Sequence, residues 1–159
     1  DITRTMPVNG VFTEAQRIIY NIVLEAQMEG IKACMPGNKF WSANERAIDI
    51  IATGLMENGI IGRREEYRNY FMHGTSHYLG LDVHDVGLYG ALKPGNVLTV
   101  EPGIYIPIGS NCDEKWWNIG IRIEDDILIT QTGNRVLSEC VPKSITEIEQ
   151  LMNLEKTQK

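Results

Sequence analysis

The sequence has no hydrophobic run that approaches the roughly 20 apolar residues a membrane helix requires. It also has no excess of basic residues, because 15 Lys and Arg stand against 21 Asp and Glu, which gives a formal net charge of −6. Nonspecific binding to nucleic acid depends on clustered Lys and Arg that displace counterions. We therefore expect neither a membrane nor a nucleic acid as a partner.

Cysteine is scarce, since the only three residues are Cys34, Cys112 and Cys140, far apart and outside any CxxC pattern. Such a set builds neither a disulfide scaffold nor a Cys/His zinc site, and it is typical of a reducing compartment. We therefore predict a cytoplasmic protein. The sequence also lacks an HExxH motif, an EF-hand loop, a glycine-rich phosphate loop and GxGxxG, which excludes the sites those motifs build.

One near-match to a catalytic motif fails at a decisive position. Residues 74–78 begin like the GxSxG elbow that presents a nucleophilic serine. Tyr78 stands where the second glycine must relieve the strained turn, so we do not expect a serine nucleophile.

What the sequence does contain indicates one α+β domain, because 159 residues with 43% hydrophobic content can bury a single core. Capping boxes followed by apolar residues at helical spacing predict three helices. The first runs from Thr13 to about Gly30, the second covers 42–58, and the third begins at Ser144.

The region between the second and third helices is rich in β-branched residues and is punctuated by Gly and Pro. Residues 96–106 predict a strand broken by Pro102 and Gly103, with a bend or a bulge there. Residues 119–130 predict a second strand that turns back at 132–134 into a hairpin. We expect helices packed on a mostly antiparallel sheet.

All the histidines of the chain, His73, His77 and His84, fall within twelve positions and are surrounded by glycines. A lone histidine is more often a hydrogen-bonded core residue than a ligand, and that interpretation stays open for one or two of these. Three together favour a metal or catalytic site.

Two glutamates stand in unusual places, since Glu101 and Glu124 each follow an apolar strand-like run. A carboxylate within a half-buried strand is costly unless a cation lies beside it. A metal ion would meet that need, and so would an ion pair, of Glu124 with Arg122 or of Glu101 with a lysine. We interpret Asp125 and Asp126 as a solvated strand end.

Five blocks of the sequence form a recognisable series, in order and at consistent spacing. They are DITRT at 1–5, HGTSH at 73–77, LDVHD at 81–85, TVEPGIY at 99–105 and GIRIEDD at 120–126. Together they resemble the pita-bread metallopeptidases, most closely the aminopeptidase P (Xaa-Pro aminopeptidase) family, while prolidase shares the same blocks. The resemblance extends from Asp1 to about residue 150.

The resemblance implies a partial pita-bread fold (creatinase/aminopeptidase-like), with helices on a curved, mostly antiparallel sheet. Residues 1–159 would form a truncated C-terminal catalytic domain that starts after the opening strands of the fold. The start at Asp1, without a leader, likewise suggests a piece of a longer protein. A missing strand leaves an unpaired sheet edge, which favours a homo-oligomer.

The family holds two divalent metal ions, commonly manganese, with two Asp, one His and two Glu. The resemblance maps Asp1, His77, Glu101 and Glu124 onto four of these five ligands, and the first Asp would lie upstream of Asp1. Without that Asp, one of the two ions would keep only the ligands that it shares with the other ion. We expect this chain to bind at most one metal ion tightly and to have little or no peptidase activity.

The resemblance also implies catalytic roles, in a hydrolysis that two metal ions promote by activating a water. Glu101 would serve as ligand and general base, while His73 and His84 would hold the substrate carbonyl and its developing charge. Arg122 would support the site as the partner of the missing Asp, so we expect it to be left without a partner here.

The implied activity is removal of an N-terminal residue linked to proline, from a peptide substrate with proline in second position. The alternatives are a prolidase, which takes dipeptides only, and a pita-bread binding module without catalysis.

Overall fold

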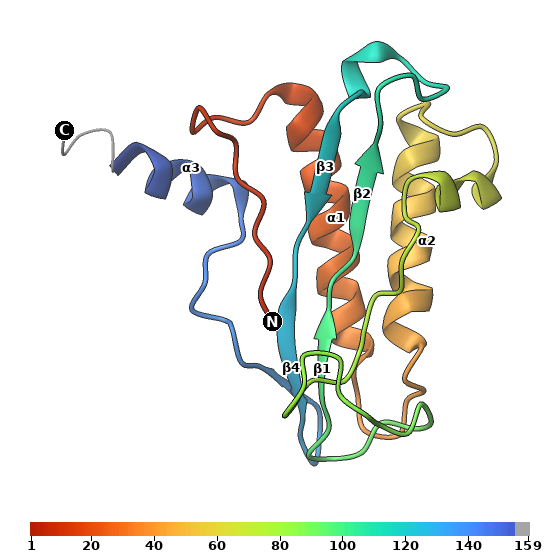
Figure 1. Ribbon diagram of the computed structural model, residues 1–159, viewed down its shortest axis with the longest axis vertical. Coiled ribbons are helices and arrows are strands. Elements are labelled where there is room, and N and C mark those ends of the chain that lie inside the picture. Colours follow the sequence, from red (N-terminus) through yellow and green to blue (C-terminus); the bar gives the residue numbers. More distant parts are fainter. Residues whose placement is uncertain (155–159) are drawn as a thin grey trace.

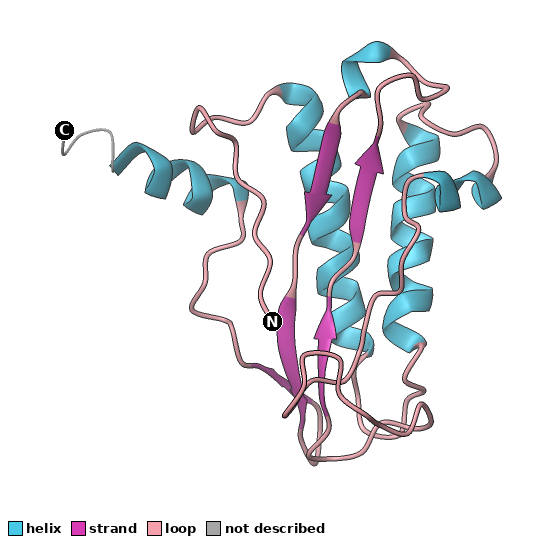
Figure 2. Ribbon diagram, in the orientation of Figure 1, coloured by secondary structure: helices cyan, strands magenta, loops and turns pink. Residues whose placement is uncertain are grey.

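The computed structural model describes residues 1–154, which form a sheet with two long helices packed against one of its faces (Figure 1). Figure 2 shows the same layers coloured by secondary structure. No helix in this part of the chain has the length and apolar content to span a membrane. The helices are α1 (Glu14–Ala33), α2 (Ser42–Glu57), α3 (Ile145–Leu154) and the 3₁₀ helices η1 (Arg64–Asn69) and η2 (Glu114–Trp116); the strands are β1 (Val97–Val100), β2 (Gly103–Ile106), β3 (Ile119–Arg122), β4 (Asp125–Ile129) and β5 (Asn134–Val136).

The helix starts agree with the capping boxes in two of three cases. Thr13 and Gln16 bond each other's backbone N–H groups ahead of α1, and Ser144 and Glu147 do the same ahead of α3. The predicted cap at Ser42 is wrong. Trp41 already has helical dihedral angles and its carbonyl accepts the first bond of α2, so Ser42 lies inside the helix.

The sheet is built around one long antiparallel hairpin that is interrupted at the same level on both arms. β1 and β2 form one arm, β3 and β4 form the other, and β5 pairs with β4. The register is the same on both sides of the interruption, so Glu101 lies opposite Glu124. The predicted break of the strand at Pro102 and Gly103 is confirmed, and the unchanged register leaves no extra residue for a bulge.

Strand alternation divides the hairpin into two faces. One face packs on α1 and α2 through buried Leu98, Val100, Ile104 and other apolar residues. The expectation that Asp125 belongs to a solvated strand end is wrong. It points to the helix side and is 0% exposed, because its neighbour Glu124 points to the other face.

Two segments without regular structure run beside the interruption and extend the sheet. The N-terminal segment lies along the arm of β3 and β4 (Figure 1), where Thr3 forms a bridge with Glu124. On the other arm, the backbone N–H of Thr99 donates to the carbonyl of His77, and that of Glu101 donates to the carbonyl of Thr75. These contacts bring the first residues of the chain and the histidine cluster to the two glutamates.

Candidate metal centre

Four side chains converge on the open face of the sheet at the interruption. Ligand atoms of Asp1, His77 and Glu124 all lie within 4.8 Å of one another. The Nε2 atom of His77 is 3.5 Å from Oδ2 of Asp1 and 3.3 Å from Oε1 of Glu101. The structure thus brings together all four residues that the resemblance maps as metal ligands.

The orientation of the His77 ring leaves one nitrogen for this cluster. Its Nδ1 lies 3.0 Å from the carbonyl oxygen of Tyr78, which can only accept, so Nδ1 carries the proton. In the neutral ring Nε2 then turns its lone pair toward the oxygens of Asp1 and Glu101. A cation among these atoms would replace repulsive contacts with attractive ones, and a backbone carbonyl that fixes the tautomer is usual for a metal-binding histidine.

Glu124 is 1% exposed, and its carboxylate accepts a hydrogen bond from the hydroxyl of Thr3. Within residues 1–154, neither this glutamate nor Glu101 forms an ion pair with Lys or Arg. The alternative of a direct pair with Arg122 is wrong, because the Nε atom of Arg122 donates to the Thr3 hydroxyl, at 3.1 Å. A buried carboxylate without a cation is costly, and this one lies opposite a second carboxylate.

The donor set fits a hard or borderline divalent ion. It offers carboxylate oxygens and one imidazole nitrogen, and it contains no thiolate. Beside it, Asp126 accepts a hydrogen bond from the backbone nitrogen of Asp1, at 2.9 Å, through Oδ2. Its Oδ1 is buried and has no hydrogen-bond partner among the described residues, while the ammonium group of Asp1 pairs with the other oxygen. The residues present therefore fit a divalent metal ion.

The remaining candidate residues line one cleft of about 390 Å³ beside these ligand atoms. His84 is exposed, and its ring stands edge to face against that of His77 with 4.3 Å between centroids. The cleft is lined by His73, Gly74, Ser76, His77, His84, Glu101 and Arg122.

His73 and Arg122 are both tied to a tyrosine that the sequence reasoning gave no role. The Nδ1 atom of His73 donates to the carbonyl of Gly74, so the hydroxyl of Tyr105 donates to its Nε2, at 2.8 Å. Burial raises the pKa of Tyr105, and the nearby Arg122 guanidinium opposes the rise. The expectation that Arg122 lacks a partner is wrong, since it contacts both Tyr105 and Thr3.

Thr3 and Tyr105 had no role predicted from the sequence, although DITRT at 1–5 contains the first and TVEPGIY at 99–105 contains the second. Each lies an even number of residues from a predicted ligand in an extended segment, Thr3 from Asp1 and Tyr105 from Glu101. Alternation places such pairs on one face of a sheet, and this signal could have found them.

Comparisons with known proteins find a family match and similar relatives. Residues 1–131 match the family model for metallopeptidase family M24. The chain is 48% identical over 165 residues to a Xaa-Pro aminopeptidase of Haemophilus influenzae, covering 96% of this chain and 38% of that protein.

Two solved structures are similar to the chain over nearly all of its length. Aminopeptidase P from Escherichia coli with the inhibitor Pro-Leu gives a TM-score of 0.94 at 48% identity, over 99% of this chain and 38% of that one. Pseudomonas aeruginosa aminopeptidase PepP gives 0.95 at 43% identity, over 99% and 39%. The predicted partial pita-bread fold is confirmed, and the chain spans less than two fifths of these relatives.

Proposed function

Because this chain belongs to metallopeptidase family M24, we propose that the polypeptide containing it releases the N-terminal residue of peptides with proline in second position. The convergence of Asp1, His77, Glu101 and Glu124 beside an open cleft carries the proposal. The relatives named Xaa-Pro aminopeptidase support the choice of substrate.

The proposed cofactors are two divalent metal ions, Mn²⁺ by preference, held by these four side chains and one ligand from elsewhere in the polypeptide. When bound, such ions lower the pKa of a water and polarise the scissile carbonyl. Oxygen-rich ligation with a single imidazole supports manganese over a thiolate-seeking metal.

The side chains of this chain would perform the proton transfer and the positioning. Glu101 would accept the proton of the attacking water, with its carboxylate oriented by the Thr99 hydroxyl at 3.3 Å. His73 and His84 would hold the substrate carbonyl and the charge that develops on it. His73 would do so only after its Nδ1–H leaves the Gly74 carbonyl, because its Nε2 accepts from Tyr105. Arg122 would hold the Thr3 hydroxyl against Glu124.

The test is an assay of the full polypeptide with Mn²⁺ on three peptides: an Xaa-Pro-Xaa tripeptide, the same tripeptide with alanine second, and an Xaa-Pro dipeptide. Cleavage of the first supports the proposal. Cleavage of the dipeptide alone would indicate a prolidase, and no cleavage of any would indicate a binding module. The variant Glu101→Gln should lower kcat by about 10²–10⁴-fold, as expected for loss of a general base.

The 159 residues alone are proposed to act as a truncated C-terminal catalytic domain that binds at most one metal ion tightly and has little peptidase activity. Support comes from the 38% share of the relatives that the chain covers and from the fifth ligand, which the resemblance places upstream of Asp1. Calorimetric titration with Mn²⁺ gives the stoichiometry. Robust cleavage of an Xaa-Pro-Xaa tripeptide by the isolated chain would contradict the proposal.

Two further expectations belong to the same proposal. The three cysteines are all unpaired, which supports a reducing compartment such as the cytoplasm; cell fractionation tests this. A homo-oligomer formed through an unpaired sheet edge stays a prediction. Light scattering should give a mass above that of one chain, and a monomer at every workable concentration would contradict it.

A further inference from the structure

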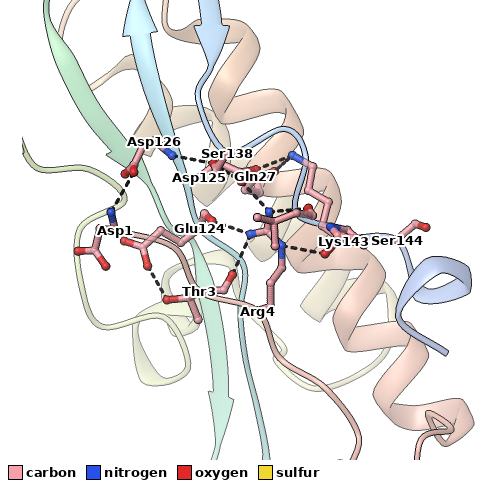
Figure 3. Close-up of polar contacts among 12 residues, drawn as sticks. Asp1, Thr3, Arg4, Gln27, Glu124, Asp125, Asp126, Ser138, Lys143 and Ser144 are labelled. Atoms are coloured by element: carbon pink, nitrogen blue, oxygen red, sulfur yellow. Dashed lines mark hydrogen bonds and ion pairs between the residues drawn. The ribbon is translucent and has the colours of Figure 1, made fainter. Parts of the chain in front are cut away.

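A buried charge cluster lies on the helix side of the sheet, directly behind the candidate metal centre (Figure 3). Its centre is Asp125, which is 0% exposed and accepts four hydrogen bonds. Burial alone would raise the pKa of Asp125, but hydrogen bonds from Lys143, Ser138 and Arg4 outweigh it and hold the pKa below its usual range. The donors are Ser138 at 2.6 Å and Gln27, Lys143 and Arg4 at 2.7 Å each.

Arg4 differs from the other donors because it also binds the backbone. Its side chain is 8% exposed, and the five N–H groups of the guanidinium match five acceptors. Besides Asp125, these acceptors are backbone carbonyl oxygens from three separate segments of the chain. They belong to Glu124 at 2.6 Å, Pro142 at 2.9 Å, and Thr3 and Val141 at 3.0 Å.

Two of these carbonyls belong to Thr3 and Glu124, the residues of the β-bridge that places the candidate ligands Asp1 and Glu124 side by side. The backbone N–H of Glu124 donates to the carbonyl of Thr3, at 3.1 Å, and Arg4 binds the carbonyls of both residues. On the opposite face the Thr3 hydroxyl donates to the Glu124 carboxylate, and Asp1 lies two residues earlier on the same strand-like segment. The register between Asp1 and Glu124 therefore depends on contacts that Arg4 makes from behind.

We propose that Arg4, anchored by Asp125, is a positioning residue of the metal centre that sets the separation of the Asp1 and Glu124 carboxylates. This inference rests on the proposed function. The role belongs to the planar guanidinium fork rather than to its charge, because a lysine offers three donors from one point and cannot span the same carbonyls. A buried ion pair by itself is weak evidence of stabilisation, so the bonds to the Thr3 and Glu124 carbonyls carry the argument.

The experiment compares Arg4→Lys with Lys143→Met in the full polypeptide. Lys143 lies as close to Asp125 as Arg4 does, but its ammonium does not contact the Thr3 or Glu124 carbonyls, so it is the matched control. Mn²⁺ affinity is measured by calorimetry and by the EPR signal of the bound ion, and the stability without metal by thermal unfolding in EDTA. Arg4→Lys should weaken Mn²⁺ binding by about 10–100-fold, the usual effect of losing an outer-shell partner. Lys143→Met should leave the affinity unchanged even where it lowers the unfolding temperature.

An Arg4→Lys protein with the parent affinity overturns the inference. Equal losses of affinity in both variants also overturn it, because the cluster would then only hold the fold together. If Arg4→Lys shows no cooperative unfolding, the double variant Arg4→Gln/Asp125→Asn removes both charges of that pair, and Lys143, whose side chain is 27% exposed, keeps its bond to Gln27. It should fold and bind Mn²⁺ weakly, and the parent affinity in this variant overturns the inference as well. A parent that neither binds Mn²⁺ nor cleaves Xaa-Pro peptides refutes the proposed function instead, and the role of Arg4 falls with it.

Discussion

Replacing Glu124 by glutamine should make the metal-free protein more stable, although it removes a candidate ligand. Carboxylate oxygens of Asp1 and Glu124 lie within 4.8 Å of each other. Two unit charges about 5 Å apart repel by roughly 3 kcal/mol at an effective dielectric constant of about 20. The Asp1 side chain is 32% exposed, and screening by water and salt reduces the expected gain to about 1–2 kcal/mol. Glutamine keeps an oxygen that can accept the hydrogen bond from the Thr3 hydroxyl.

The assay is thermal unfolding, first with EDTA and then with excess Mn²⁺. A gain of this size raises the unfolding temperature by about 2–8 °C for a chain of this length. At a free Mn²⁺ concentration of 100 times Kd, the parent should gain about 2.7 kcal/mol from binding, whereas the variant, with one ligand weakened, should gain much less. The order of the two unfolding temperatures should therefore reverse when the metal is added.

The control is Glu139→Gln, which makes the same chemical change at an exposed position and should shift neither curve. Added salt should shrink the difference between Glu124→Gln and the parent in EDTA, because salt screens the repulsion. A Glu124→Gln variant that unfolds at or below the parent temperature in EDTA would refute the reasoning. Glu124 would then make a net favourable interaction without a cation.

Three other substitutions or labelling tests follow from the same structure. Gly54→Ala should lower the free energy of unfolding by about 1–3 kcal/mol, measured with urea, because the new Cβ would lie 2.8–2.9 Å from an isoleucine side chain of α1; an unchanged value would mean that the helices can separate freely. Burial raises the pKa of the Cys34 thiol to about 12, so a thiol reagent at neutral pH should label exposed Cys140 and leave Cys34 unmodified until denaturant is added. Mass spectrometry of the labelled peptides checks this, and early labelling of Cys34 would contradict it. Thr3→Val removes the hydroxyl donor to Glu124 and should weaken Mn²⁺ binding by about 10-fold or more, while Thr3→Ser should bind as the parent does.

The sequence predicted the elements whose signals are local. The capping boxes at Thr13 and Ser144 and the interrupted strand at Pro102 need only neighbouring residues, and the structure has all three. Ser42 shows the limit of the method, because Trp41 enters the helix first and the backbone, not a side chain, closes the first turn.

The environment of Asp125 could not be predicted, because its partners are distant in the sequence. Arg4 lies 121 residues before it and Lys143 lies 18 residues after it, on opposite ends of the chain. Alternation does predict that Asp125 faces away from Glu124, but it does not tell which cations would meet a carboxylate there. The convergence of Asp1 with the histidine cluster came from the resemblance and not from any spacing in the chain.

The shared register of the two hairpin arms restricts how the length of this sequence can vary. A single residue inserted between β1 and Glu101 would turn the glutamate toward the helix side of the sheet. It would also move an apolar side chain to the open face, into the cleft. Additional residues in the connection at 107–118, beyond the far end of both arms, would leave the pairing of Glu101 with Glu124 untouched. Natural homologues should therefore gain and lose residues in that connection and keep a constant count along both arms.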